Sequence, residues 1–313
     1  MPIVVDDKGG AIALMLVSLF LLGTWPALLT LLERRGRLPQ HTYLDYSITN
    51  LLAAVVMALT LGQAGQSKPG MPKFFTQLAQ IQDNWPSVLF AVAGGISLGF
   101  GNLVLQYAFA FAGLTVTSVV VSSLIVVTGT TMNYFLDERI NHAAILFPGV
   151  GCFLIAALLG AAVHASNIKD DEKKLSMSGK PFQKQLSRGV EASIDVTCSA
   201  ASFSIFTPAF NVATNDQWHT LRNGSPHLVV YTAFFYFSVS CFVLEICLNV
   251  WFLYRPMADV PASSIRAYIE DWNGRHWALL AGLLCGFGNG FKFMGGQAAG
   301  YAASDAVQVF LHQ

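Results

Sequence analysis

The stretch GISLGFGN at residues 95–102 is repeated as GLLCGFGN at residues 282–289, 187 positions further along the chain. The register continues past both motifs, because Ala112-Gly113 is matched by Ala299-Gly300 at the same offset. Agreement of several positions at one offset indicates an internal repeat and not a chance match. The chain is therefore predicted to contain two similar halves.

The sequence around both motifs is strongly apolar. Of the 313 residues, 54% are hydrophobic and 12% are charged, and the mean hydropathy is +0.52. These shares lie outside the range of ordinary soluble domains and are typical of proteins embedded in a bilayer. Lys plus Arg and Asp plus Glu both number 18, so that no basic surplus favours nucleic acid as a partner.

Spanning helices are expected wherever about 20 mostly apolar residues occur together, because the hydrocarbon core is about 30 Å thick. Seven stretches meet this criterion: 9–32, 43–62, 87–111, 114–134, 143–163, 229–253 and 277–293. Two further stretches are weaker. Residues 189–210 contain Glu191 and Asp195, which are costly inside a bilayer, and residues 298–311 are short. The predicted fold class is an all-α integral membrane protein with about nine helices present.

The repeat and the order of the spans together predict the topology. Pro26-Ala27 pairs with Pro208-Ala209 ahead of the two motifs, which places the repeats at residues 1–165 and 189–313. Five spans per repeat is an odd number, so the second repeat would be inverted relative to the first, as in many secondary transporters. By the same arithmetic, a ten-helix fold would be C-terminally incomplete here, with the second repeat truncated within the ninth helix.

The distribution of Lys and Arg predicts the orientation, because these residues are retained on the cytoplasmic side of membranes. An N-terminus on the outside places twelve Lys and Arg residues in cytoplasmic loops and six outside. Residues 166–188 fall on the cytoplasmic side in this arrangement. They are polar, mix both charges and lack apolar periodicity, so we expect a disordered cytosolic linker there.

Several strings of the chain are long and specific enough to compare with known families. They are Leu22-Gly-Thr-Trp-Pro-Ala27, the stretch from Glu33 to Tyr46, the stretch from Asn211 to Thr220, Asp271-Trp-Asn-Gly-Arg275 and the stretch from Phe287 to Gln308. These strings resemble the plant ureide permease family of the drug/metabolite transporter superfamily. The resemblance covers nearly the whole chain. It implies a ten-helix fold and proton-coupled uptake of allantoin, uracil, xanthine and related oxo-purine and oxo-pyrimidine compounds.

Such substrates are flat, neutral and rich in carbonyl and N–H groups, so a cavity for them needs amides, hydroxyls and an aromatic face more than charge. The candidate substrate-binding residues in the spans are Trp25, Asn102, Gln106, Tyr107, Asn133, Asn289, Gln297 and Tyr301. Asn102 and Asn289 hold matched repeat positions, and a pseudo-two-fold axis would bring both toward the midplane. Hydrogen bonding between helices is the alternative role for this pair.

Two ionisable residues in the second repeat are relevant to the coupling of transport to protons. Asp305 is the candidate proton-coupling residue, because an aspartate inside a span is costly and indicates function. Its alternative role is that of a capping or interface carboxylate. Lys292 could pair with a membrane carboxylate, but we expect its amine to snorkel to the outer surface.

Other classes of function find less support in the sequence. The His residues lack metal-ligand spacing and the five Cys residues fall in apolar stretches, so we expect neither a metal nor a cofactor. Ser176-Met-Ser-Gly-Lys-Pro181 lacks the first glycine and the Ser/Thr of a phosphate-binding loop, so ATP binding is not expected. No nucleophile and base converge as an enzyme requires.

The alternative function is that of a truncated, non-conducting membrane protein that associates with or regulates full-length permeases. The sequence leaves the oligomeric state open, and a homo-oligomer is compatible with it. The resemblance implies the plasma membrane as the location, with retention in the endoplasmic reticulum if truncation impairs folding.

Overall fold

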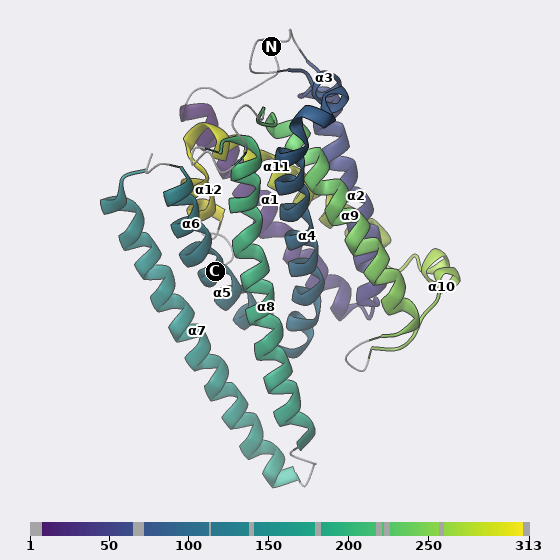
Figure 1. The fold of residues 1–313 in the computed structure, drawn as a ribbon. Coiled ribbons are helices and arrows are strands. Elements are labelled where there is room, and N and C mark those ends of the chain that lie inside the picture. The colour runs from purple at the N-terminus through teal and green to yellow at the C-terminus, as the bar shows by residue number, and fades with distance from the viewer. Residues whose placement is uncertain are drawn as a thin grey trace.

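The computed structural model describes residues 8–64, 72–112, 114–137, 141–178, 183–216, 221, 226–256 and 260–308. Within these residues the regular structure is helical and no strand occurs. Long helices run side by side as a bundle (Figure 1). The prediction of an all-α protein is therefore confirmed.

We refer to residues 8–178 as the N-terminal half and to residues 183–308 as the C-terminal half. The N-terminal half contains α1 (Lys8–Arg34), α2 (Pro39–Thr60), α3 (Phe74–Ala79), α4 (Ile81–Ala112), α5 (Leu114–Ile125), the π-helical turn η1 (Val126–Thr130), α6 (Thr131–Leu136) and α7 (Ala143–Ser178). The C-terminal half contains α8 (Gln183–Thr214), α9 (Val230–Tyr254), α10 (Ile265–Glu270), α11 (Arg275–Ala299) and α12 (Tyr301–Gln308).

Six of the described helices are long and apolar enough to cross a membrane. They are α1, α2, α4, α7, α9 and α11. The weaker stretch at residues 189–210 lies within the longer helix α8. The chain is therefore a multi-pass membrane protein.

Two of the expected spans are interrupted. The stretch 114–134 is divided into α5, η1 and α6, and the π turn contains Gly129, which lies against the side chain of Asp305. The stretch 298–311 is divided by Gly300, whose φ of 92° separates α11 from α12. Glycine adopts a positive φ without steric cost, so the break occurs where the sequence permits it. Residues 309–311 lie outside the described residues.

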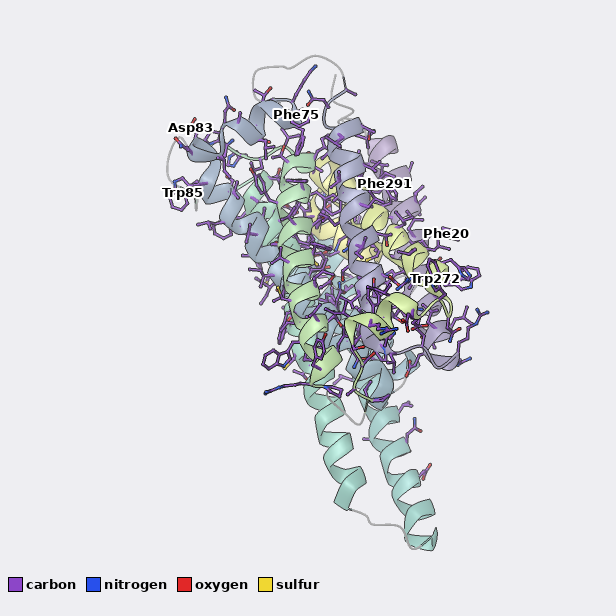
Figure 2. The ribbon with its side chains drawn as sticks, turned by 90° about the vertical axis from the view of Figure 1, so that its right-hand side faces the viewer. Phe20, Phe75, Asp83, Trp85, Trp272 and Phe291 are labelled. Carbon is purple, nitrogen blue, oxygen red and sulfur yellow. The ribbon has the colours of Figure 1, made fainter. Side chains whose placement is uncertain are left out.

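The disordered linker expected at residues 166–188 is wrong for the part of it that the structure describes. α7 continues to Ser178, and α8 begins at Gln183. Residues 164–178 contain neither Pro nor Gly and mix acidic with basic side chains, which favours a solvated helical extension. Figures 1 and 2 show these ends of α7 and α8 as a pair that extends beyond the rest of the bundle.

Helices of the two halves pack against each other through matching glycines. α4 lies against α9, where a Cβ on Gly95 would meet the hydroxyl of Ser240. α11 lies against α2, where a Cβ on Gly282 would meet the hydroxyl of Thr49. Small residues of this kind let membrane helices approach closely. The two glycine-rich repeat motifs therefore lie where helices of the two halves contact each other.

The hydrogen bonds at these two contacts also match. Ser240 Oγ donates to the carbonyl oxygen of Val92 at 3.1 Å. Thr49 Oγ1 donates to the carbonyl oxygen of Leu279 at 2.7 Å. Val92 and Leu279 are separated by the same 187 positions as the two glycine-rich motifs. The contact between α4 and α9 thus recurs between α11 and α2.

Aromatic rings fill the interior between α8, α9 and α11. Phe210 and Phe293 are stacked, with 3.7 Å between the ring centroids and 5° between the planes. Phe206, Phe234 and Phe237 surround Phe293 with their ring centroids within 6.1 Å of its own. All five rings are buried, and such pairs contribute about 0.5–1.5 kcal/mol each beyond their buried area.

The outside of the bundle is apolar as well. Phe20 on α1 is 65% exposed and points outward in Figure 2. Leu158 on α7 is 64% exposed. Apolar side chains in such numbers would be unfavourable in water, whereas the hydrocarbon of a bilayer is a matching solvent for them.

Candidate functional site

A chain of polar side chains joins four helices inside the bundle. Asn102 Nδ2 on α4 donates to Glu245 Oε1 on α9 at 2.9 Å and to the hydroxyl of Tyr46 on α2 at 3.3 Å. That hydroxyl donates to Cys285 Sγ on α11 at 2.9 Å, and Asn289 Nδ2 donates to the same sulfur at 3.3 Å. All five side chains are buried. We term these five residues the central polar cluster.

Aromatic rings form one wall of the central polar cluster. The ring centroids of Trp25 on α1 and Tyr46 are 5.5 Å apart, and those of Tyr43 and Tyr46 are also 5.5 Å apart. All three rings are buried. Because flat heterocycles stack on aromatic faces, this wall and the neighbouring amides together offer the groups that a ureide site requires.

A second polar cluster contains a buried ion pair. Lys292 Nζ on α11 lies 2.7 Å from Asp305 Oδ1 on α12, and the two side chains are 2% and 1% exposed. Lys292 Nζ also donates to Thr207 Oγ1 at 3.1 Å and lies 4.6 Å from the ring centroid of Phe206. Asp305 Oδ2 accepts a hydrogen bond from Asn133 Nδ2 at 2.7 Å. Both charges are thus paired and hydrogen-bonded, as buried ions must be.

Further hydrogen bonds extend this cluster to the end of α6. Asn211 Nδ2 on α8 donates to Asn133 Oδ1 at 3.0 Å and to Asp137 Oδ1 at 2.8 Å. Asp137 Oδ2 accepts from the backbone N–H of Ala302 on α12 at 3.1 Å. We term Asn133, Asp137, Thr207, Asn211, Lys292 and Asp305 the paired-charge cluster.

Buried amides and a buried ion pair inside a membrane bundle are features that transport proteins use. A family model described as ureide permease matches residues 42–199 and 180–311 of this chain. The chain belongs to the ureide permease family. Ureide permeases are transporters and not enzymes, so this chain is a transporter.

Individual ureide permeases match almost the whole chain. Ureide permease 5 from Arabidopsis thaliana is 55% identical over 97% of this chain and 84% of its own length. Ureide permease 2 from the same plant is 56% identical over 97% of this chain and 87% of its own length. Probable ureide permease A3 from Vigna unguiculata is 54% identical, with coverages of 98% and 93%. No solved structure matches the chain.

This ureide permease structure brings several predicted site residues together. Asn102, Asn289 and Trp25 meet at the central polar cluster. Asn133 and Asp305 meet in the paired-charge cluster. Asn133, a predicted substrate-binding residue, therefore lies beside the predicted proton-coupling residue, whereas Asn102, Asn289 and Trp25 lie at the other cluster.

The remaining predicted residues lie elsewhere. Tyr301 is fully buried, and its hydroxyl lies 2.9 Å from Thr214 Oγ1, so that it joins α12 to α8. Gln297 is half-buried near the C-terminal end of α11. Gln106 and Tyr107 belong to α4, but their side chains lie outside the described residues.

The snorkelling role expected for Lys292 is wrong. The expected span ended at Phe293, which would place the amine within reach of the membrane surface. α11 instead continues to Ala299, so Lys292 lies well inside the helix. Its amine remains in the interior because Asp305 supplies the opposite charge. The alternative, pairing with a membrane carboxylate, is what the structure contains.

Sequence reasoning missed the functional potential of Glu245, which lies inside α9 and is fully buried in the central polar cluster. An ionisable side chain within an apolar span is itself a signal of function, and this signal was present in the sequence. Ser47 and Asn102, which contact Glu245, could not be identified there, because they come from α2 and α4.

A third set of polar residues, which we term the loop-end charge cluster, ties the start of α2 to the loop before α11. Asp45 Oδ2 lies 2.6 Å from Arg37 Nη2 and 3.2 Å from Arg275 Nε. His41 Nδ1 lies 2.7 Å from Asp271 Oδ2. Partial burial raises the pKa of Asp271, but the His41 hydrogen bond and nearby positive charge outweigh it and hold that pKa below its usual range.

Proposed function

We propose that this chain is a proton-coupled secondary transporter of allantoin, uracil, xanthine and related oxo-purine and oxo-pyrimidine heterocycles in the plasma membrane. The family supports a ureide as the substrate, because the relatives are named ureide permeases. These compounds share flat rings, neutral charge and alternating N–H and C=O groups. Their site needs neutral hydrogen-bonding side chains and an aromatic face.

The central polar cluster is the observation on which the proposed substrate site depends. Asn102 and Asn289 each carry an amide with donors and an acceptor, and both lie beside the hydroxyl of Tyr46 or the thiol it contacts. Trp25 adds a ring face beside the same hydroxyl. A ureide placed among these groups would exchange its hydrogen bonds with water for hydrogen bonds with the amides.

The proposal includes alternating access between two inverted five-helix repeats. The recurrence of the α4 and α9 contact between α11 and α2 supports such a two-fold relationship. The central polar cluster lies where these four helices meet. Rocking of one repeat against the other would expose this cluster first to one side of the membrane and then to the other.

The proposed proton carrier is Asp305. When the outside is acidic, protonation would remove the negative charge that Lys292 contacts at 2.7 Å. The ion pair would then weaken, while the amide of Asn133 would still have a hydrogen-bonding partner. α12 would be free to shift relative to α11. Loss of the proton on the neutral side would restore the pair and reset the transporter.

Orientation is a further part of the proposal. Arg37 and Arg275 of the loop-end charge cluster belong to the Lys and Arg residues assigned to the cytosolic side, with the N-terminus outside. The cluster joins the loop between α1 and α2 to the loop before α11. It would therefore hold the cytosolic end of the bundle together while the outer end opens.

Uptake of labelled uracil and allantoin by yeast lacking its own permeases would test the proposed function. We expect uptake at about pH 5 to exceed that at about pH 7, because the outside proton concentration drives symport. Cells with an empty vector provide the background. No uptake above this background, with the protein present in the plasma membrane, would contradict the proposal.

A further inference from the structure

The hydroxyl of Ser47 lies between two oxygen atoms that both form short contacts with it. Ser47 Oγ is 2.6 Å from the backbone carbonyl oxygen of Tyr43 and 2.6 Å from Glu245 Oε2. A serine hydroxyl has one hydrogen, so it donates to one of them. A neutral carboxyl group on Glu245 provides a hydrogen for each contact: Ser47 donates to the Tyr43 carbonyl oxygen, and the carboxyl O–H donates to Ser47.

The second oxygen of Glu245 fits the same protonation state. Glu245 Oε1 accepts from Asn102 Nδ2 at 2.9 Å, as the carbonyl oxygen of a neutral acid does. Oε2 then carries the proton and donates to Ser47. The contacts of Glu245 with Ser47 and Asn102 therefore each have one donor and one acceptor.

The surroundings of Glu245 also favour a neutral carboxyl group. Its side chain is fully buried on α9. Within the described part of the chain, no Lys, Arg or His approaches it to ion-pair distance. The titratable neighbours are Cys241, Tyr46 and Cys285, which supply no positive charge. An unpaired carboxylate in this place would be costly, unlike that of Asp305, which faces an amine.

We propose that Glu245 is a neutral carboxylic acid in the resting transporter and recognises the substrate by the adjacent N–H and C=O groups of a ring amide. This inference rests on the proposed function, because the substrate class comes from it. Glu245 thereby becomes the residue that distinguishes ring amides from other flat, neutral molecules.

The chemistry of the two groups is complementary. A neutral carboxyl group presents an O–H donor beside a C=O acceptor. A ring holds its amide cis, so hydantoin, uracil and xanthine rings also present an N–H donor beside a C=O acceptor. The carboxyl O–H donates to the ring carbonyl, and the ring N–H donates to the carboxyl C=O. A carboxylate would lack the donor and could satisfy only the ring N–H.

Two of the hydrogen-bonding partners of Glu245 belong to the other half of the molecule, and the third, Cys241, lies on α9 itself. Ser47 is on α2 and Asn102 is on α4, whereas Glu245 is on α9. Movement of α9 away from α2 and α4 would free the donor and the acceptor of the carboxyl group together. Polar groups freed inside a membrane need new partners. A ring amide supplies both at once.

Two substitutions test the inference. Glu245→Gln keeps an N–H donor beside a C=O acceptor, and Glu245→Leu removes both. We expect Glu245→Gln to keep the KM for uracil within about threefold of wild type, and Glu245→Leu to raise it about tenfold or more. Glu270→Gln, at an exposed site on α10, is the matched control and should leave uptake unchanged.

Competition by 1,3-dimethyluracil adds a test of recognition. Methyl groups block both ring N–H donors of this analogue. The wild type and Glu245→Gln should therefore prefer uracil over the dimethyl compound by about tenfold or more, and the preference should shrink in Glu245→Leu. Thermal unfolding in detergent identifies any variant whose fold, and not whose recognition, has changed.

Infrared spectroscopy of the purified proteins reports the protonation state of Glu245 independently of any transport measurement. We expect a carboxylic-acid C=O stretching band near neutral pH in the wild type and in Glu270→Gln, and its loss in Glu245→Gln. Absence of this band, loss of uptake in Glu245→Gln as large as in Glu245→Leu, or wild-type uptake in Glu245→Leu would overturn the inference. Failure of the wild type to transport any ureide would contradict the proposed function, and the infrared band would still decide the protonation state.

Discussion

Lys292 Nζ and Asp305 Oδ1 form an ion pair at 2.7 Å, with both side chains almost completely buried. The pair connects α11 to α12, which Gly300 separates along the chain. Inside a membrane protein each of these charges is tolerated because the other is present. Removal of one charge should therefore affect the environment of the other.

Lys292→Met leaves the carboxylate of Asp305 buried without its cation. We expect a loss of about 3–5 kcal/mol in the free energy of unfolding, the usual effect of breaking a buried pair from one side. The double variant Lys292→Met with Asp305→Asn removes both charges and should be more stable than Lys292→Met alone. Equilibrium unfolding in mixed detergent measures both values. An equal loss in the single and the double variant would show that the two charges are not coupled.

Asp305→Asn keeps the size of the side chain but cannot carry a proton. We expect its uracil uptake at about pH 5 to show no excess over that at about pH 7, because the proposed proton carrier is absent. Asp83→Asn, at the exposed start of α4 (Figure 2), is the control and should keep the acid stimulation of the wild type. Acid stimulation that persists in Asp305→Asn would assign coupling to another group.

Gly95→Ala and Gly282→Ala add a methyl group where two helices touch. Each Cβ would meet a backbone carbonyl oxygen and a hydroxyl of the facing helix. We expect a loss of about 1–3 kcal/mol for each, the range found for overpacking. Gly149→Ala on α7 is the control, since a Cβ there would meet nothing within 4 Å, and it should be neutral or slightly stabilising. Thermal unfolding of the three variants in one detergent provides the comparison, and equal behaviour of all three would contradict the close contacts.

Asp271→Asn tests the loop-end charge cluster through its pH dependence. The folded pKa of Asp271 is lowered because the His41 hydrogen bond and Arg37 outweigh burial, which raises it. The resulting stability is complete above the unfolded pKa of about 4 and is lost as the pH falls through the folded pKa. We expect Asp271→Asn to lose about 1 kcal/mol near pH 7 and to equal the wild type at low pH. The free energy of unfolding, measured across pH for the wild type, Asp271→Asn and the control Glu270→Gln, tests this prediction. A stability difference between Asp271→Asn and the wild type that stays constant with pH would contradict the prediction.

The sequence was sufficient to locate the long helices, because apolar length alone determines them. The stretch expected at residues 229–253 is α9 at Val230–Tyr254, and the stretch expected from residue 143 is the start of α7. The π turn at Val126–Thr130 could not be predicted, because an apolar α-helix and an apolar π turn have the same composition. Helicity beyond residue 163 was missed because a solvated helix lacks apolar periodicity.

Part of the candidate site could also be predicted from the sequence, because of the internal repeat. The repeat assigned Asn102 and Asn289 to equivalent positions, and both reach the central polar cluster. Pairing of Lys292 with a membrane carboxylate was one of two roles that the sequence offered, and the choice between them depends on how far α11 continues past Phe293 and on where α12 returns.

The π turn η1 has a consequence for the ion pair on the opposite side of Asp305. A Cβ on Gly129 would lie 3.0 Å from Asp305 Oδ2, so the carboxylate rests almost directly on the backbone of this turn. The volume of residue 129 therefore limits how far the carboxylate can retreat from the amine. A larger residue there would press the two charges together or displace α12. The strength of the ion pair could thus be adjusted by bulk alone, at a position that carries no charge and has no polar side chain.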